Sequence, residues 1–166
     1  NTSVEIETFV HGALCISYSG QCLMSGMIGG RSGNRGRCAQ PCRLPYTLVD
    51  EENNNVLNNI DVGEYLLSPK DLKTIEVIPK LINAGVHSFK IEGRMKRAEY
   101  VAVVVDAYRR AIDQYLLNAE VNIGLTEDKN LAQIFNRDFT QAYLFKKLGR
   151  QMLSDKRPNN RGVKLG

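Results

Sequence analysis

Short apolar segments alternate with helical segments along this chain, and that alternation limits its fold more than any other feature. "VEIETFVHG" and "HSFKIEGR" have the pattern of strands, and "DLKTIEVIPKLINAGV" between them has the pattern of a helix. A longer helical segment, "RAEYVAVVVDAYRRAIDQYL", follows the second strand. This order predicts an α/β protein with parallel βαβ units. An open doubly wound sheet and a closed (β/α)8 barrel fit the pattern equally well.

Residues between these segments predict where the helices begin and end. In "EYLLSPKDL" a buried strand leads into a helix, with Ser68 as the predicted N-cap and Pro69 in the first turn. Asp71 would favour the same end through the helix dipole. Pro79 interrupts the helical pattern and Gly85 closes it, so we expect a helix that is broken or offset near Pro79.

Three further segments have recognisable patterns. The long helix carries an apolar stripe at helical spacing, formed by Val101, Val104, Val105, Tyr108 and Ile112. "NIGLTEDKNLAQIFN" predicts another helix, with Thr126 as its N-cap. "PYTLVDEENNNVLNNI" predicts two short strands around an Asn-rich turn, and therefore a hairpin excursion over residues 44–60.

The charge of the chain is mildly basic, with 22 Lys and Arg against 18 Asp and Glu and a net charge of +4. This balance permits a nucleic-acid partner without requiring one. The sequence has no signal-peptide pattern and no run of 18 apolar residues, so we expect a cytoplasmic protein. It opens on "NTSVEIETFV" and closes on "NNRGVKLG", which we interpret as the cut ends of a fragment.

All four cysteines fall in one glycine-rich segment, with the spacing Cys15-x6-Cys22-x15-Cys38-x3-Cys42. Four thiolates supplied by loops are the ligand set of a 4Fe–4S cluster or of a tetrahedral zinc ion. Two disulfides also fit the even count but need an oxidising compartment, and four unligated thiols would make the clustering a coincidence. Zinc sites usually begin with a short C-x2–4-C knuckle, whereas here the first pair is Cys15-x6-Cys22, so the spacing favours iron–sulfur over zinc.

Polar residues lie where the predicted strands end, and in parallel α/β folds chemistry gathers at the carboxyl ends of strands. That rule selects three groups: Glu7, His11 and Cys15; Ser68 and Asp71; and Lys90, Glu92 and Arg94. The last three alternate and would share one face of their strand. Basic residues form three further groups: Arg31, Arg35, Arg37 and Arg43; Arg94, Lys96 and Arg97; and, near the end of the chain, Lys146, Lys147, Arg150, Lys156, Arg157 and Arg161.

The segment "ETFVHGALCISYSGQCLMS" resembles the signature of the peptidase U32, or collagenase-like, family. The fixed positions of that signature are filled here by Glu7, Phe9, Gly12, Ala13, Leu14, Cys15, Gly20, Cys22, Met24 and Ser25. "GNRGRCAQPCR", "LLSPKDL" and "FKIEGRMKRAEYVA" are similar to further family blocks in the same order. The resemblance covers residues 5–110, and "NRDFTQAYL" and "RPNNRGVKLG" match more weakly.

The resemblance implies a (β/α)8 barrel of the TIM type, of which this chain would be the last third. Residues 1–118 would be the C-terminal part of the barrel domain, with the cysteine cluster at 15–42 and the hairpin at 44–60. Residues 119–166 would form a helical and basic extension that leads to a small C-terminal β-domain.

The resemblance also implies a chemistry: oxygen-independent hydroxylation of a tRNA wobble uridine, a 23S rRNA cytidine or a ubiquinone precursor. Carried over to this sequence, the 4Fe–4S ligands would be Cys15, Cys22, Cys38 and Cys42. Prephenate is an implied co-substrate, and tRNA or rRNA, a small anionic metabolite and a second subunit are the expected partners. The family name implies proteolysis instead, and the ubiquinone branch implies a cluster-carrying subunit. All three functions stay open at this point.

Under the hydroxylase hypothesis, the candidate proton-transfer residues are Glu7, His11 and Glu92. The candidates for binding phosphates or an anionic co-substrate are Arg35, Arg37, Lys90 and Arg94, with Arg31 and Lys96 nearby. A structural role competes for two of them, because His11 could be an interior histidine and Glu7 could pair with Lys90 or Arg94. A peptidase would need an activated nucleophile or a metal-bound water, and the chain has only two histidines, His11 and His87.

Overall fold

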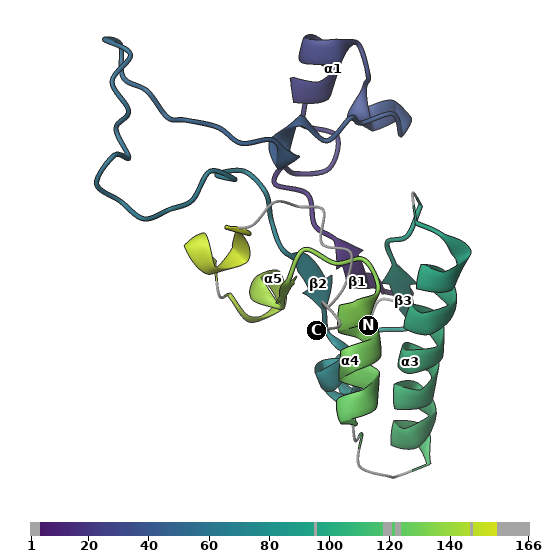
Figure 1. Cartoon of the computed structure of the whole chain (residues 1–166). Helices are drawn as coiled ribbons and strands as arrows, with labels where there is room; N and C mark the ends of the chain where they lie inside the picture. Colours follow the sequence, from purple (N-terminus) through teal and green to yellow (C-terminus); the bar gives the residue numbers. More distant parts are fainter. Residues whose placement is uncertain (1–3, 95, 118–120, 122–123, 147, 156–166) are drawn as a thin grey trace. The chain divides into compact units, whose positions relative to one another are not determined.

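The computed structural model describes residues 4–94, 96–117, 121, 124–146 and 148–155. Its strands are β1 (Glu7–Ala13), β2 (Asp71–Lys73), β3 (Ser88–Ile91) and β4 (Phe139–Thr140). Its α-helices are α1 (Met24–Gly29), α2 (Ile78–Asn83), α3 (Ala98–Leu116), α4 (Leu125–Gln133) and α5 (Ala142–Phe145) (Figure 1). The predicted domain boundary after residue 118 falls outside the described residues.

The chain forms two compact units. The first unit contains β1 together with Asp71–Gln141, and therefore the whole sheet and the helices α2, α3 and α4. The second unit contains Leu14–Lys70 with the segment that begins at Ala142, and therefore α1, α5 and all four cysteines. The cysteine segment is thus inserted between two neighbouring strands of the first unit.

The sheet has the strand order β3-β1-β2-β4 and is mixed. β1 pairs with β3 in parallel, as the βαβ pattern predicts, and β2 pairs with β4 in parallel. β1 and β2 are antiparallel, with Ala13 opposite Asp71 and His11 opposite Lys73. The expectation of an all-parallel sheet is therefore wrong for this pair, and the partial barrel is not confirmed. An antiparallel pair needs no crossover helix, and the inserted second unit makes the connection.

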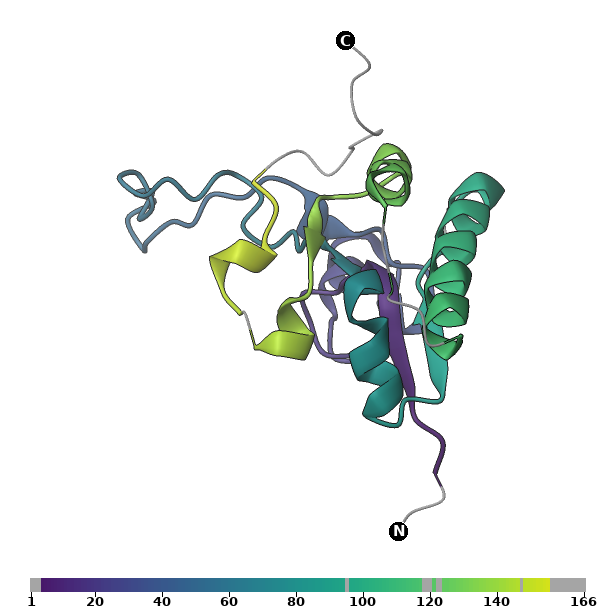
Figure 2. The ribbon, with the colours of Figure 1, turned by 90° about the horizontal axis from the view of Figure 1, so that it is seen from below.

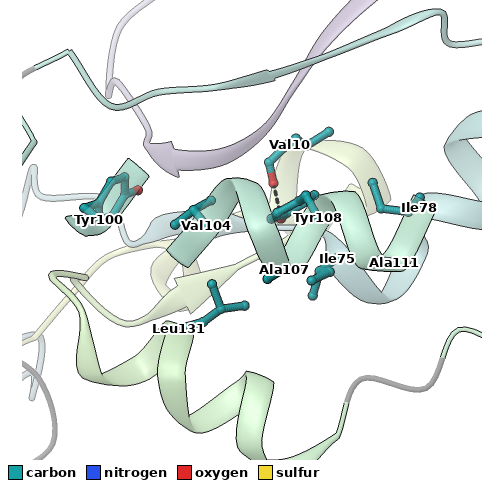
Figure 3. Packing of buried hydrophobic residues seen from close by; sticks show 9 residues of the cluster. All are labelled: Val10, Ile75, Ile78, Tyr100, Val104, Ala107, Tyr108, Ala111 and Leu131. Atoms are coloured by element: carbon teal, nitrogen blue, oxygen red, sulfur yellow. Dashed lines mark hydrogen bonds between the residues drawn. The ribbon is translucent and has the colours of Figure 1, made fainter. Parts of the chain in front are cut away.

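The core of the first unit lies between β1 and the helices. Its buried cluster joins residues from β1, the α2 region, α3 and α4: Val10, Ile75, Ile78, Tyr100, Val104, Ala107, Tyr108, Ala111 and Leu131 (Figure 3). Figure 2 shows α2 and α3 next to β1 from below. The predicted α3 stripe is wrong at Val101 and Val105, which are 41% and 46% exposed. Small Ala107 and Ala111 are buried instead, which rotates the buried face of α3 toward them.

The helix ends follow the sequence pattern in part. α2 begins with Pro79 in its first turn, and Gly85 follows it with a φ of +84°, so the predicted offset and stop are confirmed. The predicted helix start at Ser68 is wrong, since Asp71 lies in β2 and a 3-10 turn at Ile75–Val77 precedes α2. Thr126 is not an N-cap either, because α4 begins one residue before it.

The excursion over residues 44–60 is a turn with few strand contacts. Val49 and Asn55 form an isolated antiparallel bridge, and the Asp50 carboxylate accepts hydrogen bonds from the Glu52 and Asn54 N–H groups at 2.9 and 2.8 Å. The hairpin geometry is thus present at its tip, without two extended strands. No helix in the described part of the chain is both long and apolar enough to cross a bilayer.

Candidate functional site

All four cysteines lie in the second unit, in the loops on either side of α1. Cys15 is exposed, the other three are half-buried, and all four are free thiols. Cys22 precedes α1, Cys38 lies between two 3-10 turns at Gly33–Arg35 and Pro41–Arg43, and Cys42 lies within the second turn. One compact unit therefore supplies four thiols, from two loops and one 3-10 turn.

Hydrogen bonds hold these loops against α1. Ser25 is buried in α1, and its hydroxyl accepts a hydrogen bond from the Ala39 N–H at 2.8 Å. The Asn34 side chain donates to the Gly20 carbonyl at 3.2 Å, which ties the second loop to the first. These hydrogen bonds therefore hold the segments that carry Cys22 and Cys38 in place next to α1.

Arg43 closes the cysteine segment at its base. Its guanidinium is buried and donates to the Leu14 carbonyl at 2.6 Å, to the Ser68 hydroxyl at 3.0 Å and to the Pro69 carbonyl. Leu14 begins the segment and Pro69 lies near its end, so one cation joins the two ends of the insertion. Arg43 is thus a structural residue, and Ser68 is an acceptor for it rather than a helix cap.

The four sulfurs influence one another electrostatically. Burial raises the pKa of the Cys42 thiol, the neighbouring Cys15, Cys38 and Cys22 raise it further, and Arg43 opposes these effects. A bound cation would relieve the repulsion among four thiolates. Across the described residues, no three His, Cys, Asp or Glu side chains form a ready-made metal site. The donor chemistry thus fits a thiolate-bound metal, while the four thiols do not form a closed cage.

Glu7 lies at the amino end of β1, not after the strand as predicted. It forms an ion pair with Lys90 at 3.1 Å and accepts a hydrogen bond from the Ser88 hydroxyl at 2.9 Å. These two partners lower the pKa of the Glu7 carboxyl, the Lys90 hydrogen bond most. Four residues of strand, about 13 Å, separate Glu7 from His11. Glu7 therefore does not join the other two proton-transfer candidates, and Lys90 is engaged as its partner.

His11 lies in the interior of the first unit. Its ring packs against Tyr100, Tyr108 and Phe139 at centroid distances of 6.1, 5.5 and 5.7 Å, and its Nδ1 lies 3.3 Å from the Tyr108 hydroxyl. Burial, and then the charge of Lys73, lower the pKa of His11 to about 3. A neutral, enclosed imidazole of this kind favours the structural role over proton transfer.

Glu92 lies at the carboxyl end of the parallel pair β1 and β3. Its N–H donates to the His11 carbonyl at 2.8 Å, and its half-buried carboxylate accepts from the Arg94 N–H at 3.3 Å. Gly12 makes this approach possible, because a Cβ at that position would lie 2.3 Å from the Glu92 carbonyl oxygen and Gly12 has a φ of +107°. Of the three proton-transfer candidates, Glu92 alone stands at the predicted end of the sheet with a partly accessible carboxylate.

A buried polar group that the sequence analysis missed lies at the same end of the sheet. Arg137 donates to one oxygen of Asp71 at 3.0 Å, and both side chains are nearly fully buried. The other Asp71 oxygen and the Tyr100 hydroxyl have no hydrogen-bond partner among the described residues. Burial, and then the charges of Asp71 and Glu92, raise the pKa of Tyr100. The strand-end rule had selected Asp71, and the weakly matching block "NRDFTQAYL" was the one sequence signal for Arg137.

The sequence model of peptidase family U32 matches residues 1–154. The chain is 44% identical over 144 residues to tRNA hydroxylation protein P1 of Bacillus subtilis, covering 84% of this chain and 34% of that protein. It is 46% identical over 142 residues to a collagenase of Porphyromonas gingivalis, with 84% and 34% covered. It is 49% identical over 112 residues to a 23S rRNA 5-hydroxycytidine synthase of Escherichia coli, with 68% and 16% covered.

The chain spans about a third of the length of the first curated relatives that it matches. No solved structure matches it. The family match covers both compact units, including all four cysteines and the Asp71–Arg137 pair. This chain therefore belongs to peptidase family U32.

Proposed function

We propose that this chain is part of an enzyme that hydroxylates a pyrimidine in RNA, and that Cys15, Cys22, Cys38 and Cys42 hold a 4Fe–4S cluster. The observation that carries the proposal is a set of four free thiols in one unit of a chain that is 44% identical to a tRNA hydroxylation protein. A cluster of this kind supplies electron transfer when it is bound. The names of the relatives supply tRNA and an rRNA cytidine as substrates, and a tRNA uridine is what the family resemblance implies.

The residues of this chain would then have separate tasks. The Gln40 N–H already donates to the Cys38 sulfur at 3.2 Å, a bond that stabilises thiolate charge. Glu92 is the remaining candidate for proton transfer, because its carboxylate is half-buried at the carboxyl end of β1 and β3. Arg94, two residues later and exposed, is the remaining candidate there for an anionic co-substrate such as prephenate.

Proteolysis is the second candidate function, and it is favoured by the relatives that are named collagenase. A thiol peptidase would need an imidazole that is accessible to its nucleophile. The Nδ1 of His11 contacts the buried Tyr108 hydroxyl, and the Nδ1 of His87 accepts a hydrogen bond from the Ile6 N–H at 3.3 Å. His11 is therefore enclosed, and the exposed His87 lies at the amino end of β3, at the opposite end of the strand from Glu92.

Two experiments test the proposal. Protein purified without oxygen should be brown, absorb near ~400 nm and contain about four iron atoms per chain. Serine variants of the cysteines should lose this absorbance, and the matched control Ser19→Ala, in the same segment, should keep it. A colourless protein with one zinc per chain would contradict the cluster.

The activity itself is tested in a strain that lacks the gene. Mass spectrometry of tRNA and rRNA nucleosides should show the loss of a hydroxylated pyrimidine, which the wild-type gene restores. If the hydroxylated nucleosides are unchanged in that strain, the RNA-hydroxylation proposal is refuted. Gelatin cleavage that persists in the serine variants would establish the peptidase instead.

A further inference from the structure

The second unit exposes an unusual set of apolar side chains close to the cysteines. Tyr18 is 88% exposed and Met27 is 81% exposed. Leu23 and Ile28, at 63% and 69%, extend the same set along α1. The exposed arginines Arg31, Arg35 and Arg37 follow directly in the sequence. We refer to Tyr18, Leu23, Met27, Ile28 and these three arginines as the Tyr18–Arg37 surface.

Hydrogen bonds fix the arginine loop relative to the tyrosine turn. The Asn34 side chain donates to the Gly20 carbonyl at 3.2 Å, and the Gln21 N–H donates to the Tyr18 carbonyl at 3.2 Å. The Arg31 Nε donates to the Arg37 carbonyl at 2.9 Å and closes the loop on itself. The aromatic ring and the guanidinium groups are therefore presented by one ordered part of the chain.

No acidic residue offsets the positive charge of this segment. Between Glu7 and Asp50 the sequence contains four arginines, no lysine and no acidic residue, so this stretch carries a charge of +4. The other 18 Lys and Arg residues, from the total of 22, are balanced by 18 Asp and Glu residues. Arg43 is buried at the base of the segment, which leaves three exposed cations on the Tyr18–Arg37 surface.

An exposed aromatic ring on the same ordered segment as three exposed arginines fits a strand of unpaired nucleic acid better than a membrane or an acidic protein. Bases stack on aromatic and apolar side chains, and arginines bind the phosphates between the bases. Attachment to an anionic membrane generally uses a long amphipathic helix, whereas α1 has only six residues. An acidic protein would satisfy the arginines but would leave the fully exposed Tyr18 without a stacking partner.

We propose that the Tyr18–Arg37 surface binds single-stranded RNA, with Tyr18 stacking on a base and Arg35 and Arg37 contacting phosphates. This proposal rests on the proposed RNA-hydroxylation function and adds the surface that holds the substrate strand next to the cysteine segment. It separates RNA binding from the chemistry, because none of these residues is a cysteine or a proton-transfer candidate.

The test is fluorescence anisotropy with the chain and a labelled single-stranded RNA of mixed sequence. Tyr18→Ala should weaken binding by about 5- to 150-fold, the range measured for losing one base–aromatic stack. The double variant Arg35→Gln/Arg37→Gln should flatten the dependence of log K on log salt by about 1.4, since each phosphate contact in a single strand contributes about 0.7. Circular dichroism would show that both variants remain folded.

Matched controls lie elsewhere on the chain. Tyr143→Ala removes another exposed tyrosine of the same unit, and Arg109→Gln removes an exposed arginine of α3, so both should bind RNA like the wild type. Surface variants that bind like these controls would overturn the proposal. Binding to phosphatidylserine vesicles that is lost in the surface variants, without any RNA binding, would overturn it in favour of a membrane.

The two proposals can fail separately. The nucleoside assay in the gene-deletion strain reports on hydroxylation without using this surface. If hydroxylation is lost in that strain but the surface variants bind RNA normally, the RNA-binding proposal is refuted and the hydroxylation proposal stands. Unchanged nucleosides, together with wild-type protein that binds no RNA, would refute both.

Discussion

Two buried tyrosines on α3 provide a matched pair for testing how the first unit is held together. Tyr108 and Tyr100 are both nearly fully buried and lie on the same side of the helix. The Tyr108 hydroxyl donates to the Val10 carbonyl at 2.7 Å (Figure 3). It also accepts from the Thr74 N–H at 3.0 Å. The Tyr100 hydroxyl has no hydrogen-bond partner among the described residues. Replacing each tyrosine with phenylalanine removes the same atom from two different environments.

The magnitude follows from what each hydroxyl leaves behind. In Tyr108→Phe the N–H of Thr74, a fully buried residue, loses its partner, and an unsatisfied buried donor costs about 1–3 kcal/mol. The Val10 carbonyl keeps one bond, from the Thr74 hydroxyl at 2.9 Å, so its loss is smaller. In Tyr100→Phe a desolvated hydroxyl without a partner disappears, so we expect a change between no effect and about 1 kcal/mol of stabilisation.

Urea denaturation of the two variants and the wild type, followed by circular dichroism at 222 nm, measures the difference. Tyr108→Phe should lower the free energy of unfolding by about 1–3 kcal/mol with an unchanged m-value, and Tyr100→Phe should not lower it. Equal losses in the two variants would refute the reasoning, because they would show that the loss does not depend on the hydrogen bonds of the Tyr108 hydroxyl.

Three further predictions concern the same unit. The pKa of His11 is lowered to about 3, so the stability that its neutral ring contributes is complete above the unfolded pKa of 6.5 and is lost as the pH falls toward 3. Between pH 6.5 and 5, urea titrations should therefore show that the free energy of unfolding falls by about 2 kcal/mol more in the wild type than in His11→Gln. Asp71→Asn removes the buried carboxylate that faces Arg137 and should cost about 3–5 kcal/mol, and a loss below 1 kcal/mol in thermal melts would contradict a buried ion pair. Gly85→Ala introduces backbone strain at a positive φ into open space, so it should cost about 1–3 kcal/mol. Gly12→Ala adds a clash with the Glu92 carbonyl to the same strain, so it should cost more. Equal melting temperatures of the two variants would contradict the close approach to Glu92.

Local pattern was sufficient for several elements of this fold. The periodicity of residues 98–116 predicted α3, the pattern of "HSFKIEGR" predicted β3, and Pro79 and Gly85 predicted the limits of α2. These signals come from backbone geometry and helical spacing, which act within a few residues. The clustering of Cys15, Cys22, Cys38 and Cys42 was equally plain in the sequence, and their role as ligands stays a prediction.

The pairing of strands and the meaning of polar residues depended on long-range contacts. Asp71 has the local features of a helix start, yet it lies in β2 opposite Ala13 and pairs with Arg137, 66 residues away. Ser68 likewise meets Arg43 rather than a helix end. Neither partner can be inferred from neighbours in the chain, because the insertion of a second unit between β1 and β2 brings the strands together in antiparallel order.

The proton-transfer candidates show the same division. Glu7, His11 and Glu92 share a strand-rich sequence context, but the structure places Glu7 at the amino end of β1, encloses His11 among aromatic rings and leaves Glu92 at the carboxyl end. Sequence could identify residue types able to carry the chemistry. Burial and strand register decided which of them can meet a substrate, because both depend on residues distant in the chain and close in space.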